Sequence, residues 1–177
     1  MSAPTKEMTG TQMRSAIAAF VKAWNDHDVE AIVAKTTTDV VWASANAPGP
    51  ARVAHGREAA AADVRAGLAA LPDMQMAMED LHIFTTDDPS VGFSTWTTTG
   101  TMTGPLEGMA PTGKSARVRG VCQYRFRDGL IAEHTMVYDR MDMCQQLGLL
   151  PYEEELGFKA LAQVQRLSRK TRKVLHI

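Results

Sequence analysis

The sequence of 177 residues has few of the features that mark secreted, membrane-bound or nucleic-acid-binding proteins. It has two cysteines, Cys122 and Cys144, and isolated cysteines predict reduced thiols, not a disulfide framework. No apolar run approaches the roughly 20 residues that cross a bilayer, and residues 1–10 contain no apolar signal segment. The formal net charge of −1 gives no general attraction to nucleic acid. We therefore expect a cytoplasmic protein without a membrane or nucleic-acid partner.

Several enzyme signatures are also missing. The histidines show no metal-ligand spacing such as His-x-x-x-His, so no metal site is predicted. The sequence contains no serine-hydrolase elbow, no glycine-rich phosphate loop and no dinucleotide-binding fingerprint. What it does contain is 45% hydrophobic and 22% charged residues, a composition typical of one globular domain.

The first half of the chain has helical patterns. Apolar residues recur at helical spacing over residues 11–27 and form one stripe that ends at Trp24. Asp28 is placed to cap a second, short helix over residues 29–34. The alanine-rich residues 57–71 predict a third helix, which stops before Pro72.

The second half has the period of two that is typical of strands. After a short strand at residues 39–42, long strands are predicted at residues 74–84, 91–103, 116–127 and 130–139. Helices first and antiparallel strands afterwards indicate an α+β architecture. A curved sheet folded round a long helix leaves a concave apolar pocket, and the 11 methionines are core filler or part of its lining.

The chain divides into a flexible N-terminus (residues 1–10), one domain (residues 11–151) and a C-terminal extension (residues 152–177). The extension begins with acidic residues and ends with basic ones, an order that favours a helix because it complements the helix dipole. Its basic end lacks the interleaved aromatic residues typical of nucleic-acid sites. We expect a solvated or docked terminal helix.

Short motifs follow one another from residue 20 to residue 151. They are Trp24-Asn25 with Asp28, Leu71-Pro72-Asp73, Gly100-Thr-Met-Thr-Gly104, Pro111-Thr-Gly-Lys114, Tyr124-Arg-Phe-Arg-Asp-Gly129, Ile131-Ala-Glu-His134, Asp139 and Gln146-Leu-Gly148. In this order and spacing they resemble the SnoaL-like polyketide cyclase family of the NTF2-like superfamily. The resemblance implies an α+β cone or barrel, with a curved antiparallel sheet round a long N-terminal helix, usually in a homodimer; the C-terminal helix is extra.

The same resemblance implies a chemistry. Characterised cyclases of the family close a ring by intramolecular aldol condensation without metal or cofactor, and an aspartate at the end of the last long strand is their acid/base. Asp139 occupies that place here. Two positions depart from the family: Met102 stands where relatives usually carry His, and Thr135 where they often carry Trp. Because of these two departures, we do not assign the family's known substrate to this protein.

The Asp128-Gly129 turn decides which residues share a face with Asp139. A two-residue type I′ turn pairs Phe126 with Ile131 and sets Asp139 beside Cys122 and Tyr124. A three-residue loop with a bulge at the glycine shifts the register by one and joins Asp139 to Gln123, Arg125, Thr135 and Val137. The family's polar positions favour the second register.

In that register the site has defined roles. Apolar neighbours such as Val137 raise the pKa of the Asp139 carboxyl, which can then accept and return a carbon-bound proton. The Gln123 amide holds a developing enolate oxygen, whereas Arg125 within about 4–6 Å lowers the pKa of Asp139. The plain alternative is that Asp139 is the N-cap of the helix that follows it.

Trp24, Trp42 and Trp96 are candidates for the pocket wall, and each is equally compatible with the core. Met102 is a fourth candidate for contact with the ligand. The favoured function is a cyclase or isomerase acting on a hydrophobic polyketide-like or polycyclic ketone through Asp139. A non-catalytic module that binds small molecules is the main alternative. An epoxide hydrolase of the same fold ranks lower, because the central strands supply no second aspartate.

Overall fold

The computed structural model describes residues 8–44 and 53–152, together with residues 154, 156, 157, 159, 160 and 162–164. Of the C-terminal extension, residues 156–157, 159–160 and 162–164 are helical, and the rest of the predicted terminal helix lies outside the described residues. The predicted flexible N-terminus is described only at residues 8–10, where Thr9 already caps the first helix.

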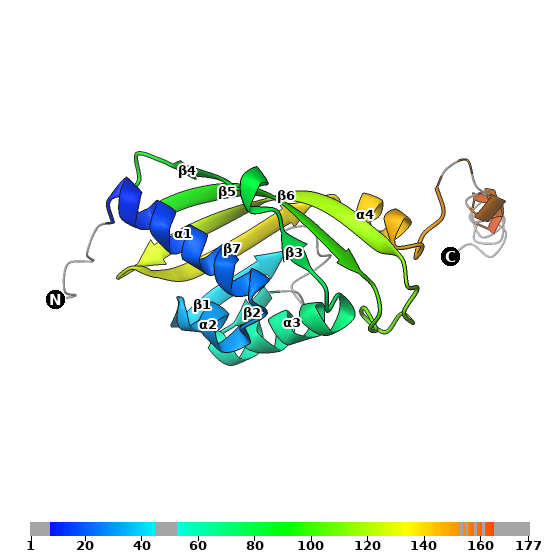
Figure 1. Ribbon diagram of the computed structural model, residues 1–177, viewed down its shortest axis with the longest axis horizontal. Coiled ribbons are helices and arrows are strands. Elements are labelled where there is room, and N and C mark those ends of the chain that lie inside the picture. Colours follow the sequence, from blue (N-terminus) through cyan, green and yellow to red (C-terminus); the bar gives the residue numbers. More distant parts are fainter. Residues whose placement is uncertain are drawn as a thin grey trace, which may run out of the picture.

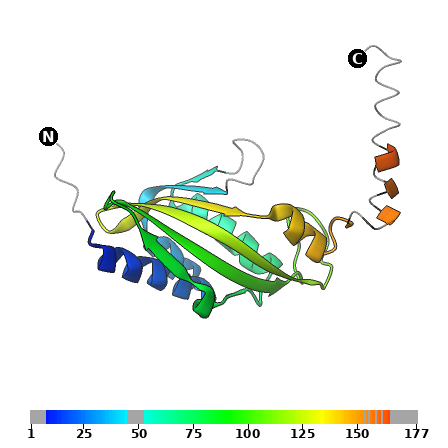
Figure 2. The same cartoon turned by 90° about the horizontal axis from the view of Figure 1, so that it is seen from above.

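One face of a curved, unclosed sheet is covered by helices (Figures 1 and 2). The helices are α1 (Gly10–Asn25), α2 (Val29–Ala34), α3 (Arg57–Ala70) and α4 (Arg140–Gln146). The strands are β1 (Thr36–Ser44), β2 (Val53–His55), β3 (Gln75–Met76), β4 (His82–Thr85), β5 (Val91–Thr101), β6 (Ser115–Arg127) and β7 (Leu130–Tyr138). Their order in the sheet is β2-β1-β7-β6-β5-β3, with β4 also paired to β5, and only β1 and β7 run parallel. The predicted α+β architecture is confirmed.

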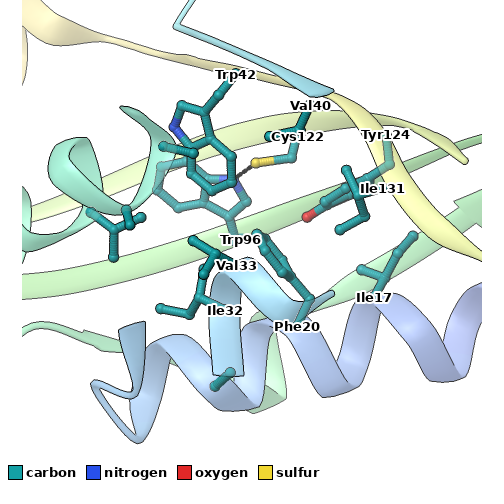
Figure 3. Packing of buried hydrophobic residues seen from close by; sticks show 14 of the residues in the cluster. Ile17, Phe20, Ile32, Val33, Val40, Trp42, Trp96, Cys122, Tyr124 and Ile131 are labelled. Carbon is teal, nitrogen blue, oxygen red and sulfur yellow. Dashed lines mark hydrogen bonds between the residues drawn. The ribbon is translucent and has the colours of Figure 1, made fainter. Parts of the chain in front are cut away.

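The long helix α1 forms where its sequence pattern predicts it. Thr9 and Gln12 make a capping box, each side chain bonding the other's backbone N–H. The stripe of Met13, Ile17 and Phe20 is buried against the sheet, as Figure 3 shows for Ile17 and Phe20. The Asp28 carboxylate accepts the Ala31 N–H at 2.8 Å and begins α2, which confirms the predicted cap.

The predicted strand over residues 74–84 is wrong as one element. It is broken into β3 and β4 by a 3₁₀ turn, η2 (Met78–Asp80). Both pieces pair with β5, Met76 with Thr98 and His82 with Thr95. Six residue steps along this segment therefore match only three along β5, and the excess is taken up by the turn. The short strand β2 was not predicted, and β1 is longer than predicted.

The β6–β7 hairpin combines the two predicted alternatives. Asp128 and Gly129 have φ of 53° and 79°, so the turn has two residues, and Phe126 pairs with Ile131. The favoured three-residue loop is therefore wrong. A bulge then intervenes on β7, because Arg125 pairs with Glu133 and leaves residue 132 over. Beyond this bulge Gln123 pairs with Thr135, so that Gln123, Thr135 and Val137 share one face, as the three-residue loop predicted. The pairing itself differs, because that loop would have placed Gln123 opposite Glu133.

No helix within the described residues is both long and apolar enough to span a membrane.

Candidate functional site

A cavity of about 600 Å³ lies between the helix-covered face of the sheet and the helices α1 and α3. Its walls are mostly apolar, and aromatic rings from five elements dominate them. These rings belong to Phe20, Trp24, Trp42, Trp96, Tyr124, His134 and Tyr138. A concave apolar cavity with a few polar groups is the usual form of a small-molecule site.

All three predicted tryptophans line this cavity. Trp42 and Trp96 are each 4% exposed and belong to the core as well, so the two interpretations coincide. Trp24 stacks on Trp42 with ring centroids 6.2 Å apart. The Trp96 indole N–H donates to the Cys122 sulfur at 3.2 Å, the dashed line in Figure 3. The fourth predicted residue, Met102, is fully buried and packs in the core instead of lining the cavity.

Polar groups at the sheet side of the cavity are uncharged at neutral pH. Tyr124 and Ser94 share a hydrogen bond of 2.9 Å between their hydroxyls, and burial raises the pKa of Tyr124 well above its ordinary value. Burial also raises the pKa of the Cys122 thiol to about 11. It lowers the pKa of the His134 imidazole to about 3, because the charged form is penalised away from water.

Of the described residues that line the cavity, Asp63 and Glu107 carry carboxylates. Asp63, on α3, accepts the Trp42 indole N–H at 3.1 Å. Glu107 lies in the turn between Leu106 and Met109 and forms an ion pair with Arg140 of α4. Within the part of the chain that the structure describes, no cluster of three or more His, Cys, Asp or Glu is suited to hold a metal ion.

Asp139 follows the last residue of β7, at the end of the last long strand as predicted. Its Oδ1 accepts the Asp142 N–H at 2.9 Å and caps α4, which confirms the N-cap interpretation. The side chain is exposed and is not part of the cavity wall, whereas its neighbour Tyr138 is. Because successive residues of a strand face opposite sides, Asp139 continues the row of Val137 on the outer side.

The predicted neighbours of Asp139 lie on that outer face too. Gln123, Arg125, Thr135 and Val137 are not among the cavity-lining residues, and Arg125 approaches Asp88 and Glu133 at 3.6 Å. They share one face as predicted, but the helices cover the other face of β6 and β7. This placement corrects the predicted pocket face, which carries Cys122, Tyr124, His134, Met136 and Tyr138 instead.

The alternation of these strands contained a signal for the covered face. On β6 the residues facing the helices are buried, as Cys122, Tyr124 and Phe126 are, and all are apolar or aromatic. Their strand neighbours Gln123, Arg125 and Arg127 are polar. This contrast alone predicts the face of β6 that lines the cavity. The prediction followed the family's polar positions instead and chose the other face. Asp63 had no comparable signal, because it is one acidic residue on a helix whose position over the cavity depends on the fold.

The model of the SnoaL-like polyketide cyclase family matches residues 14–147. The chain belongs to the SnoaL-like polyketide cyclase family. No curated protein matches the sequence.

Solved structures show that this member of the family has the NTF2-like fold. AclR from Streptomyces galilaeus has a TM-score of 0.67 at 24% identity, over 93% of this chain and 98% of that one. TsrD from Streptomyces laurentii has a TM-score of 0.67 at 23% identity, over 81% and 100% of the two chains. IdmH from Streptomyces antibioticus has a TM-score of 0.61 at 26% identity, over 76% and 97%. IdmH is described as a candidate polyketide cyclase and AclR as a candidate hydroxylase. A shared fold does not by itself fix the chemistry.

Proposed function

We propose that this protein binds a hydrophobic polyketide-like or polycyclic ketone in the cavity and catalyses a cyclase- or isomerase-type reaction on it. The observation that carries the proposal is the cavity of about 600 Å³ with aromatic walls, in a member of a cyclase family. The proposed reaction uses no cofactor, since proton transfer at a carbon beside a carbonyl needs only an acid/base group.

The walls fit a flat, fused-ring ligand. The stacked pair of Trp24 and Trp42 offers an extended aromatic surface, and Phe20 meets the Trp42 ring at a centroid distance of 6.0 Å. Aromatic rings favour offset-stacked or edge-to-face contacts with one another, so these side chains suit a planar conjugated ring system. The neutral state of Cys122, Tyr124 and His134 keeps this part of the cavity free of charge at neutral pH.

Filling the cavity from α3 tests the binding step. Ala66 lines the cavity, and a phenyl ring at this position occupies ligand space. We expect Ala66→Phe to weaken binding of anthrone, a planar tricyclic ketone, at least about tenfold in a fluorescence titration. Ala62→Phe on the same helix is the control, because Ala62 is exposed, as Ala66 is, but does not line the cavity. Equal loss in both variants, or in neither, would contradict binding in this cavity.

We also propose that the Asp139 carboxylate is the acid/base of the reaction, acting through one of its two oxygens. Oδ1 is engaged in the α4 cap, so Oδ2 has to accept the proton, from a ligand that extends past Tyr138 at the end of β7. Asp139→Asn keeps a good helix cap, so we expect an unchanged melting temperature. The catalysed exchange of the C10 protons of anthrone with deuterium, followed by NMR under argon, should fall at least about tenfold. Exchange at the wild-type rate would leave Asp139 as a helix cap only.

The same assay separates catalysis from binding alone. A ligand that binds the folded state raises the stability of the protein, so anthrone would stabilise a non-catalytic binding module. Such a module would leave the exchange rate of the anthrone protons at the uncatalysed value.

The proposal also includes a cytoplasmic homodimer. The exposed apolar side chains of Val121 and Val137, 41% and 44% exposed on the outer face of the sheet, support an association through that face.

A further inference from the structure

Three cavity-lining residues from three elements form what we call the polar corner: Trp42 of β1, Asp63 of α3 and His134 of β7. Trp42 and His134 are neighbours in the parallel pairing of β1 and β7, and their ring centroids lie 4.2 Å apart. The Trp42 indole N–H also donates to Asp63 Oδ2 at 3.1 Å. The indole thus contacts both a carboxylate and an imidazole in a cavity whose walls are mostly apolar.

His134 is the unusual member of this corner. It is 2% exposed, and its ring lies against Phe20 and Tyr124 as well as Trp42. Its Nδ1 is buried without a hydrogen-bond partner. An unpartnered buried polar atom costs about 1–3 kcal/mol, so one that persists in a binding cavity calls for a partner that the ligand supplies.

The imidazole is available as an acceptor at neutral pH. Burial holds the pKa of His134 at about 3, so the ring is neutral and one of its nitrogens carries no proton. A half-turn about the Cβ–Cγ bond exchanges nitrogen and carbon positions with little change in ring shape. Either edge of the ring can therefore present a nitrogen to the cavity that the residue lines.

The hydrogen-bond donors and acceptors of the polar corner determine which ligand groups can bind there. The Asp63 carboxylate only accepts hydrogen bonds, and the Trp42 N–H, the donor beside it, is already engaged with that carboxylate. The neutral His134 imidazole supplies one acceptor nitrogen and one N–H donor, so the corner offers acceptors from two residues and a single free donor. An O–H group, which can donate as well as accept, uses these acceptors, whereas an ether oxygen can only accept. The natural complement of the corner is an O–H donor on a flat ring, not an ether.

We propose that the polar corner is a subsite for ring hydroxyl groups of the ligand, with the His134 imidazole and the Asp63 carboxylate accepting hydrogen bonds from phenolic or enolic O–H groups. The inference rests on the proposed function, because it assumes that the cavity takes a ligand. It adds the selectivity that the apolar walls cannot supply, since a buried acceptor such as His134 discriminates strongly against an analogue that lacks the donor, whereas Asp63 is exposed.

Two probes with the same ring system test this subsite. 2-Naphthol carries an O–H donor, and 2-methoxynaphthalene replaces it with an ether. We expect the wild-type protein to bind 2-naphthol about tenfold more tightly, which corresponds to about 1.4 kcal/mol for the added hydrogen bond. Dissociation constants for both probes are measured by fluorescence titration at pH 7, where 2-naphthol is un-ionised.

Variants then locate the preference. His134→Phe removes the acceptor and keeps an aromatic ring, while Asp63→Asn keeps an oxygen for Trp42 and turns an NH₂ donor towards the ligand. We expect each to reduce the 2-naphthol preference about threefold, and the double variant to abolish it. Met136→Leu, two residues along β7 in the same wall, is the matched control and should keep the preference.

The outcomes are distinct. A wild-type preference below about twofold, or a preference that the double variant retains, overturns the subsite. Binding of neither probe contradicts both the subsite and the proposed binding cavity. A protein that prefers 2-naphthol as expected but does not exchange the protons of anthrone keeps the subsite and loses the proposed catalysis. If His134→Phe does not fold, Asp63→Asn on the exposed side of α3 still carries the test.

Discussion

Acidification from pH 7 to pH 4.5 is expected to lower the free energy of unfolding by about 3 kcal/mol through His134 alone. In the unfolded chain this imidazole has a pKa near 6.5, whereas burial holds its pKa in the folded protein at about 3. Between these values the unfolded state binds a proton that the folded state excludes. The contribution of His134 to stability is therefore complete above pH 6.5 and is lost as the pH falls towards 3.

His134→Phe separates this effect from the rest of acid denaturation. Asp39, Asp73, Asp80 and Asp88 also lose stabilising interactions in acid, because hydrogen bonds lower the pKa of each carboxyl. Their contributions are common to both proteins and cancel in the difference. The side chains that meet the imidazole are Phe20, Trp42 and Tyr124, and Tyr124 stays neutral over this range.

Urea unfolding at pH 7 and at pH 4.5 measures the difference. The stability of His134→Phe relative to the wild type should rise by about 3 kcal/mol between the two pH values. Parallel curves would show that the folded protein accepts the proton, and hence that the imidazole is not as buried as the structure has it. At pH 7 the variant should be at least as stable as the wild type, since it removes an unpartnered buried nitrogen. A residue that costs stability in this way and lines the cavity is expected at a binding site.

Local sequence signals predicted most of the fold, because they act over a few residues. The stripe of α1 and the Asp28 cap depend on neighbours within four positions, and both are confirmed. The break between β3 and β4 depends on β5, since two segments must pair with one strand at unequal spacing. No local pattern encodes that mismatch, so the segment was predicted as one strand.

The face of the site was harder to predict than its strands. One extra residue at position 132 decides which residues of β7 stand opposite which residues of β6, and a bulge has no turn-like composition to reveal it. Which face is then covered depends on where α1 and α3 dock, at long range in the sequence. Asp139 was consequently placed at the right end of the right strand, while its neighbour Tyr138 is the one that reaches the cavity.

Gly120→Ala is expected to destabilise the protein by about 3 kcal/mol and to weaken ligand binding. Gly120 pairs with Trp96 across β5 and β6, and the indole lies directly over its missing side chain. A Cβ here would stand 2.2 Å from Cζ2 and 2.6 Å from Cη2 of Trp96. The ring would have to move. This movement breaks the hydrogen bond from the Trp96 indole N–H to the Cys122 sulfur and shifts one wall of the cavity.

Gly67→Ala is the matched control, because Gly67 lines the cavity, as Trp96 does, but has no atom within 4 Å of an added Cβ. It lies inside α3, where alanine is favoured over glycine by about 0.5–1 kcal/mol, so this variant should be more stable than the wild type. The same chemical change, glycine to alanine, is thus expected to lower the free energy of unfolding at Gly120 and to raise it at Gly67 in urea unfolding. Destabilisation by both variants to a similar extent would mean that the added methyl group itself is not tolerated. A neutral Gly120→Ala would mean that Trp96 does not lie across the strand.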